Sequence, residues 1–138
     1  LGDSKDKFKI VAQQDGGAAL DKSMELAEDI ITASPDMDAF FCINDPSALG
    51  AAAAIKAANK TGKIGVYSID ASPDGKQALL DDEFTAVACQ VPVQIADYSF
   101  KEAVKYVNGD TKIDEKKVYL DSHLVSKDEA EKTLKEWQ

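Results

Sequence analysis

The sequence predicts an α/β fold in which strands and helices alternate and the strands form a mainly parallel, doubly wound sheet. Short apolar runs alternate with longer stretches whose apolar residues recur at helical spacing. A proline or a capping residue opens most of the helical stretches. The chain has 138 residues, 44% of them hydrophobic, which is enough for one domain with a buried core. Strands that alternate with helices favour parallel pairing through right-handed crossovers.

The first predicted unit combines a strand over 8–13, a turn and a helix. The strand is the run FKIVAQ, and Asp15, Gly16 and Gly17 follow it with the composition of a turn. A helix over 20–34 is indicated by apolar residues at spacings of three and four. The apolar positions on its face are Leu20, Met24, Ala27 and Ile31, with Leu26 and Ile30 beside them.

The second unit is a strand over 39–43 followed by a helix over 46–59. The strand is a continuous apolar run, typical of a strand buried on both faces. Asp45 is placed to cap the helix, and Pro46 suits its first turn, where no amide donor is needed. Asn44 therefore stands at the carboxyl end of a strand, where open parallel sheets bind ligands. The alternative is that Asn44 only satisfies free amides of the turn.

The third unit repeats this pattern. A strand over 64–69 ends at Asp70. Ser72 and Pro73 then supply a capping hydroxyl and a proline, which together predict the start of a helix over 74–80.

A further strand and a longer helix complete the series. The strand over 85–89 ends at Gln90, and Pro92 opens a helix that Asn108 and Gly109 end. Four apolar residues of this helix are expected to face inward. They are Ile95, Phe100, Ala103 and Val107.

The C-terminal residues predict one more extended stretch and a short helix. The stretch covers 118–125 and contains the single histidine, His123, which is interpreted as a surface or packing residue. Ser126 and Glu129 form a capping box that predicts a helix ending near Trp137.

Three successive strands of the predicted sheet end in a polar side chain. These residues are Asn44, Asp70 and Gln90, each followed within a few residues by a proline. Because the carboxyl ends of parallel strands meet at one edge, we expect the three side chains to line a rim there. Two amides and a carboxylate offer donors and acceptors together. This combination suits a neutral polyhydroxylated ligand, whose hydroxyl groups both donate and accept.

The composition argues against several partners and cofactors. Sixteen Lys and Arg against 25 Asp and Glu give a net charge of −9 without a basic stripe, so no nucleic acid partner is expected. No apolar run reaches the length of a membrane span. No phosphate-binding or dinucleotide-binding glycine pattern is present, and we expect no cofactor and no metal. Cys42 and Cys89 lie in apolar runs and are expected to be buried, with a disulfide between them left open.

Four stretches of the chain, taken in order, carry a resemblance to a known family. The stretch FFCINDPSALGAAAAIKAA resembles an Asn-Asp-x-x-Ala-Leu-Gly-Ala segment. The stretch VAQQDGGAALDKSMELAEDIITASPDMDAFF resembles a strand-helix-strand unit with a Leu-x-Ala-x-Pro-Asp turn. VYSIDASPDGKQALLDDEFTAVACQVPVQIA resembles a Gly-x-Asp-x-x-Pro segment with the following strand and crossover. KYVNGDTKIDEKKVYLDSHLVSKDEAEK resembles a C-terminal strand and tail. Together they are similar to the ribose-binding-protein-like, periplasmic type of sugar-binding protein of ABC transporters.

The resemblance implies a periplasmic-binding-protein-like lobe in which Asn44, Asp70 and Gln90 hydrogen-bond the hydroxyl groups of a sugar. Ala18 and Ile69 stand where many members of the family place an aromatic residue, so both positions are expected to lie next to the ligand. Ser68 replaces the glycine that usually precedes the aspartate by two residues. These departures leave the identity of the sugar open.

The resemblance also implies a solute-binding, non-enzymatic component of an ABC uptake transporter, with an ABC permease as its partner. It implies an extracytoplasmic location, either periplasmic or as a cell-surface lipoprotein. Family members have two lobes, and residues 1–91 resemble part of the C-terminal lobe. Residues 92–138 are expected to pack partly on an N-terminal lobe that this chain lacks. We therefore expect a fragment that associates with itself, with a stand-alone half as the alternative.

Two other functional classes remain as alternatives. A response-regulator receiver-like signalling domain has a similar size, and Asp70 would be its phosphoacceptor. Such a domain needs an acidic cluster for Mg²⁺, whereas the first predicted strand ends in Gln13, Gln14 and Asp15, with one carboxylate. The second alternative is the effector-binding lobe of a lactose-repressor-type regulator. The acidic charge and the segment from Gln90 to Pro92 favour the transporter branch.

Overall fold

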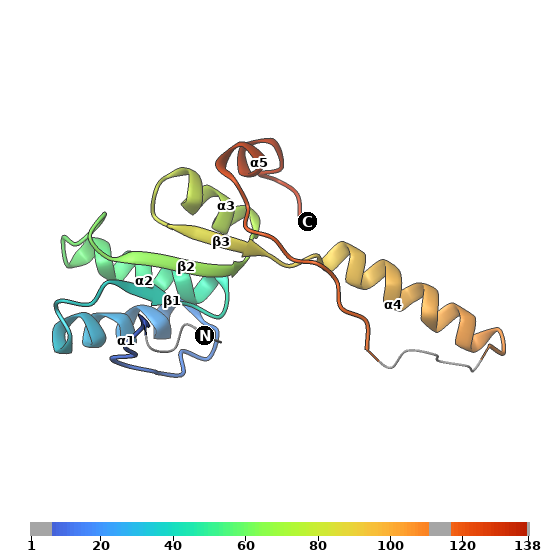
Figure 1. Ribbon diagram of the computed structural model, residues 1–138, viewed down its shortest axis with the longest axis horizontal. Helices are drawn as coiled ribbons and strands as arrows, with labels where there is room; N and C mark the ends of the chain where they lie inside the picture. Colours follow the sequence, from blue (N-terminus) through green and yellow to red (C-terminus); the bar gives the residue numbers. More distant parts are fainter. Residues whose placement is uncertain (1–6, 111–116, 138) are drawn as a thin grey trace.

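A computed structural model describes residues 7–110 and 117–137 of the chain (Figure 1). The described elements alternate between helix and strand up to β3 and end with two helices. They are α1 (Leu20–Ala33), β1 (Ala39–Phe41), α2 (Asp45–Ala57), β2 (Gly65–Asp70), α3 (Pro73–Leu80), β3 (Ala86–Cys89), α4 (Pro92–Val107) and α5 (Lys127–Lys132).

The three strands form one parallel sheet in the order β1-β2-β3, which confirms the predicted α/β class (Figure 1). Phe41 pairs with Tyr67, and Ser68 pairs with Val87. Each crossover between neighbouring strands is a helix, as parallel strands require. The carboxyl ends of all three strands therefore lie at the same edge of the sheet.

The predicted strand over 8–13 is wrong. Those residues form no strand in the structure and are exposed. The run FKIVAQ has the composition of a strand, but backbone amides and carbonyls pair only where a neighbouring strand accepts them. No strand precedes this run in the described chain, and β1 pairs only with β2.

The prediction that the strand over 39–43 is buried on both faces is also wrong. Phe41 is 77% exposed and Ile43 is 71% exposed, whereas Cys42 is buried. The cause is that α2 and α3 cover one face of the sheet, and β1 lies at its edge. The face that carries Phe41 and Tyr67 stays accessible to solvent.

Small residues allow α1 and α2 to pack closely. Ala48, Ala51 and Ala54 of α2 are buried, and Gly50 lies against the backbone of α1. A Cβ atom at Gly50 would overlap the Leu20 carbonyl and lie 2.8 Å from the Met24 amide nitrogen. The contact therefore depends on the missing side chain of this glycine.

Both cysteines are buried, as predicted, and neither forms a disulfide. Burial raises the pKa of the Cys42 thiol to about 11, so this group stays protonated at neutral pH. Cys42 acts as a small apolar residue of the core.

Helix α4 projects away from the sheet and its helices (Figure 1). None of its 16 residues is buried, so the predicted inward face of Ile95, Phe100, Ala103 and Val107 is wrong for this chain. The helix ends at Val107, and Gly109 has a φ of 95°, as expected of a glycine after a helix end. No described helix is both long enough and apolar enough to span a membrane.

The extended stretch before α5 contacts β3 only over a short distance. Leu124 forms an isolated antiparallel bridge with Ala88, and the Val125 amide donates to the Val87 carbonyl (3.0 Å). The predicted strand over 118–125 is therefore reduced to this bridge. Ser126 caps α5 as predicted, because its hydroxyl accepts from the Glu129 amide (3.2 Å). The helix ends at Lys132, however, and not near Trp137 as predicted.

A buried lysine holds α5 against α3. Lys76 is 0% exposed, and its Nζ donates to the carbonyls of Thr133 (2.9 Å) and Glu136 (2.8 Å). Thr133 is the C-cap residue of α5, where the helix dipole favours a cation, and Glu136 lies beyond the helix.

We expect Lys76→Met to lower the free energy of unfolding by about 1–3 kcal/mol, because the two carbonyls lose a charged donor. Chemical denaturation measures the change. Lys63→Met, at an exposed lysine, serves as the control and should change stability by less than about 0.5 kcal/mol. Equal stability of the two variants would show that Lys76 does not hold the tail.

Candidate functional site

Asn44 follows β1, which ends at Phe41, and caps α2. Its Oδ1 accepts from the Ser47 amide (3.1 Å), and its Nδ2 donates to the Ala18 carbonyl (3.2 Å). The predicted cap residue, Asp45, is instead the first residue of the helix. Asn44 therefore uses one amide atom as a cap and the other to hold the loop before α1.

Asp70 ends β2 and contacts the neighbouring strand ends on both sides. Its Oδ1 accepts from Gln90 Nε2 (2.8 Å), and its Oδ2 accepts from the Asp45 amide (3.4 Å). The backbone amide of Gln90 also donates to the backbone carbonyl of Asp70 (3.2 Å). The structure thus brings Asp70 and Gln90 into direct contact, and Asn44 adjoins them through the backbone of its neighbour.

The pKa of Asp70 lies above its usual value. Partial burial is the largest cause, and the nearby negative charge of Asp45 adds to it. Hydrogen bonds from the Asp45 amide and the Gln90 side chain act in the opposite direction, because they favour the ionised form. The carboxylate is therefore a partly desolvated acceptor at the edge of the sheet.

Asn44, Asp70 and Gln90 together form a polar cluster at the edge of the sheet. Ala18 and Ile69 take different positions beside this polar cluster. Ala18 has a φ of 55° in the turn that follows Gly17, and its carbonyl is bonded to Asn44. The predicted turn is present, since the Gly17 amide donates to Asp15 Oδ1 (2.8 Å). Ile69 is half-buried on β2, next to Asp70.

Sequence reasoning missed the buried carboxylate of Asp45. This side chain accepts from Ser68 Oγ (2.6 Å) and from both the amide (2.8 Å) and the hydroxyl (2.7 Å) of Ser72. Two serines around an aspartate at a strand end were a signal that an acceptor lies near. The sequence predicts only the helix cap for Ser72 and no bond from either serine to Asp45, because Asp45 is remote in sequence and has the pattern of a cap itself.

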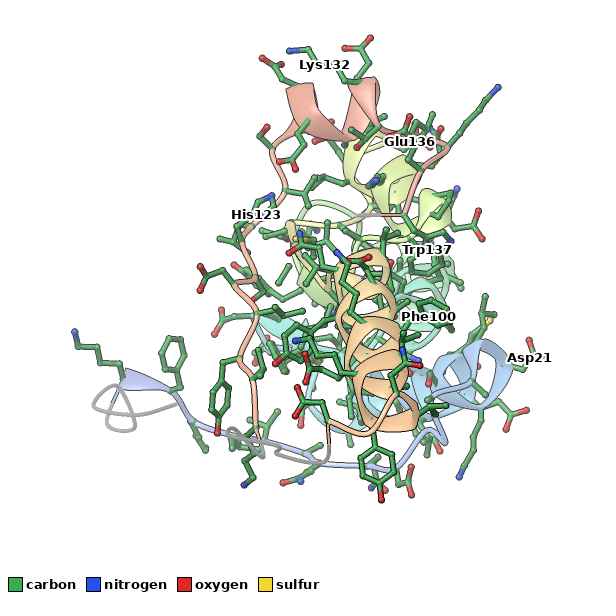
Figure 2. The ribbon with its side chains drawn as sticks, turned by 90° about the vertical axis from the view of Figure 1, so that its right-hand side faces the viewer. Asp21, Phe100, His123, Lys132, Glu136 and Trp137 are labelled. Carbon is green, nitrogen blue, oxygen red and sulfur yellow. The ribbon has the colours of Figure 1, made fainter. Side chains whose placement is uncertain are left out.

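His123 links the C-terminal stretch to the end of β3. The Cys89 amide donates to the His123 carbonyl (2.9 Å), Cys89 Sγ lies 3.3 Å from His123 Nδ1, and His123 Nε2 lies 2.8 Å from Glu129 Oε1. Figure 2 shows His123 on this stretch, apart from Phe100 on α4. These links fix the chain that runs beside Gln90.

A hollow of about 930 Å³ lies between α4 and residues 118–122 and shares only Gln90 with the polar cluster. Its remaining lining is mainly apolar and aromatic, including Ile95, Tyr98, Tyr106 and Leu120. In the described part of the chain, no three His, Cys, Asp or Glu side chains gather so as to hold a metal ion. The polar cluster itself contains one carboxylate and two side-chain amides.

Comparison with known sequences matches residues 1–111 to the family described as periplasmic binding protein domain. The ribose import binding protein RbsB of Salmonella typhimurium is 34% identical over 104 residues, which are 75% of this chain and 35% of that protein. The D-apiose import binding protein of Actinobacillus succinogenes is 31% identical over 134 residues, which are 96% of this chain and 43% of that protein. The chain therefore spans less than half the length of the relatives it matches.

Solved structures show the same fold. A galactofuranose binding protein superimposes with a TM-score of 0.83 at 32% identity, covering 91% of this chain and 44% of that one. An ABC transporter periplasmic solute binding protein from Actinobacillus succinogenes with bound D-allose gives a TM-score of 0.82 at 25% identity, covering 90% and 43%.

Proposed function

The chain belongs to the periplasmic binding protein domain family, and from that premise we propose that it binds a small neutral sugar for an ABC uptake transporter. The observation that carries the proposal is the polar cluster at the carboxyl edge of the sheet, where the Asp70 carboxylate meets the Gln90 amide beside Asn44. The matched relatives bear the names of ribose and D-apiose import binding proteins, which supports a sugar as the ligand.

The chemistry of the cluster suits a hydroxyl-bearing ligand. A sugar hydroxyl donates to a carboxylate such as Asp70 and accepts from an amide such as that of Asn44 or Gln90. The net charge of −9 disfavours an anionic ligand. Ala18 and Ile69 flank the cluster without an aromatic ring for stacking, so hydrogen bonds dominate recognition of the sugar.

The proposal extends to the partner, the location and the missing half of the site. An ABC permease receives the sugar, the protein acts outside the cytoplasm, and no bond of the sugar is broken. Residues 1–91 supply the C-terminal lobe portion of the site. Residues 92–138 contribute α4 and the stretch before α5, which pack partly on an N-terminal lobe of a longer protein.

A thermal-shift measurement tests this function. D-ribose and D-allose are added separately to the 138-residue chain and to a longer protein that includes both lobes. We expect a sugar that binds to raise the melting temperature of the protein, because a ligand that binds only the folded state stabilises that state. The rise should be larger in the longer protein. Absence of any shift in the longer protein, with these and other neutral sugars, would contradict the proposal.

We predict that Asn44→Asp weakens sugar binding by roughly tenfold while the free energy of unfolding changes by less than about 1 kcal/mol. Aspartate retains the cap on α2 but loses the Nδ2 donor and adds a charge near Asp70. Calorimetry with D-ribose or D-allose measures the affinity. Ser126→Asp makes a similar change at the cap of α5 and should leave the affinity unaltered. Unchanged affinity in Asn44→Asp would mean that Asn44 is only a cap.

We further propose that the isolated chain associates with a second copy through α4. This helix has no buried residue, and the hollow beside it is lined by apolar and aromatic side chains. Leaving one large apolar side chain in water forgoes roughly 1.5–3 kcal/mol, so covering the face of α4 is favourable. In a longer protein, the N-terminal lobe takes the place of the second copy.

Light scattering tests the association at micromolar concentration. We expect a dimer, and we expect Phe100→Glu to shift it toward the monomer, because Phe100 is an exposed apolar residue of α4 (Figure 2). Lys63→Glu is the control on an exposed residue away from α4. A stable monomer that binds no apolar dye would show that the chain is self-sufficient.

A further inference from the structure

The turn that follows β2 has an unusual backbone. Asp70 has a φ of 131° and Ala71 a φ of 57°, so two consecutive residues other than glycine have positive φ. Residues with a side chain rarely adopt such angles, and they persist only where the surrounding structure holds them. Asp70 is also the carboxylate of the polar cluster, so whatever holds this turn also sets the direction of that carboxylate.

The group that contacts both sides of the turn is Asp45. Its carboxylate accepts from Ser68 Oγ (2.6 Å), which lies before the turn, and from the amide (2.8 Å) and hydroxyl (2.7 Å) of Ser72, which lie after it. Its backbone amide donates to Asp70 Oδ2 (3.4 Å). One residue of α2 is therefore bonded before, at and after the strained segment.

The surroundings leave room for this carboxylate and for little else. Asp45 is 1% exposed, and none of the ion pairs found among the described residues involves it. A Cβ atom at Gly75, in the first turn of α3, would overlap the Asp45 carboxyl group. A buried carboxylate without a cation persists only when hydrogen bonds satisfy it, and here three donors do so.

We propose that Asp45 is a positioning residue of the binding site, which holds the turn at Asp70 and Ala71 and so presents the Asp70 carboxylate to the ligand. Asp45 does not touch the ligand itself. Its side chain faces the serines, and only its backbone amide reaches Asp70. This role in binding rests on the proposed sugar-binding function. The effect of Asp45 on the turn can be tested without any ligand.

The ligand-free test follows Asp70 by NMR in the 138-residue chain. The carboxyl carbon of Asp70 is titrated with pH, and the amide signals of Asp70, Ala71 and Ser72 are compared between the wild type and Asp45→Asn. The groups that face Asp70 are Asp45 on α2 and the Gln90 side chain after β3. The negative charge of Asp45 raises the pKa of Asp70, after the larger effect of burial. We therefore expect Asp70 to titrate at lower pH in Asp45→Asn, with shifted amide signals in the turn.

A control and a milder variant accompany this measurement. Asp74→Asn removes an exposed carboxylate from the first turn of α3 and should change neither the titration nor the turn. Ser68→Ala keeps the Asp45 charge and removes one of its donors, so it covers the case in which Asp45→Asn does not fold. We expect Ser68→Ala to shift the amide signals of the turn. Unchanged Asp70 and Ala71 signals in a folded Asp45→Asn or Ser68→Ala protein would overturn the proposal.

A binding measurement with D-ribose and D-allose, on the longer two-lobed protein, adds a second arm. We expect Asp45→Asn to weaken binding by roughly tenfold, as for coupled residues in contact. In a protein that already carries Asp70→Asn, the same change should weaken it no further, because Asp45 acts through Asp70. Additive losses would overturn the positioning role. If the wild type binds no neutral sugar, the proposed function fails, and the ligand-free arm still decides whether Asp45 holds the turn.

Discussion

Asp70→Ala should weaken sugar binding by roughly tenfold to a few hundredfold, because a hydrogen bond to a charged acceptor contributes roughly 1.5–3 kcal/mol. The carboxylate lies at the centre of the polar cluster, bonded to the Gln90 side chain and the Asp45 amide. Removing it deletes the proposed acceptor for ligand hydroxyls and leaves the Gln90 side chain without this partner. Calorimetry with D-ribose or D-allose, on a protein that contains both lobes, measures the loss.

The matched control for this prediction is Asp74→Ala. Asp74 lies four residues away, is exposed and belongs to α3, so it carries the same charge near the same edge without facing the cluster. Its removal should leave the affinity unchanged within about twofold. Equal affinity of Asp70→Ala and the wild type would exclude Asp70 from the site.

The second large effect concerns the packing of α1 on α2. Gly50→Leu should lower the free energy of unfolding by about 3 kcal/mol or more, because overpacking a tight contact forces backbone shifts. The new Cβ alone would overlap the Leu20 carbonyl and crowd the Met24 amide. Leucine favours helices more than glycine by roughly 1 kcal/mol, so any net loss must come from this contact. Denaturant titration gives the magnitude.

Ala57→Leu is the matched control, since Ala57 is the last residue of the same helix and is exposed. It should change stability by less than about 0.5 kcal/mol. Similar stability of the Gly50→Leu protein and the wild type would mean that α1 and α2 are not closely packed at this position.

Local chemistry explains which parts of the fold the sequence predicts correctly. Ser72 and Ser126 cap helices as expected, because a cap depends on amides three residues away. The end of β2 at Asp70 and the end of β3 just before Gln90 follow from a change between apolar and polar residues. Such signals are complete within a few residues of sequence and do not depend on what packs against them.

Burial was harder to predict, because it depends on the neighbours of each element. The run over 8–13 and the face of α4 have the apolar patterns of packed elements, yet both are exposed in this chain. The run over 8–13 has no strand beside it among the described residues, since β1 pairs only with β2.

In the candidate site, too, local sequence signals are predictive and contacts between distant residues are not. The repetition of polar residues at strand ends predicted that Asn44, Asp70 and Gln90 are neighbours, and the structure places Asp70 and Gln90 in contact. The role of these three residues in binding stays a prediction. Asp45 has the sequence pattern of a helix cap, because it precedes a proline. Its buried side chain instead bonds to Ser68 on β2 and to Ser72 at the start of α3. Sequence spacing does not show such a contact.

An NMR titration of the 138-residue chain with D-ribose and D-allose shows whether the polar cluster at the sheet edge binds a neutral sugar. Backbone amide signals detect binding even at millimolar affinity and locate it along the chain. We predict that a sugar shifts the signals of Asn44, Asp70 and Gln90 and of their neighbours, and that Asp70→Ala abolishes these shifts. Shifts confined to α4 and residues 118–122, or no shift at the three residues with any neutral sugar, would exclude the polar cluster as the sugar-binding site.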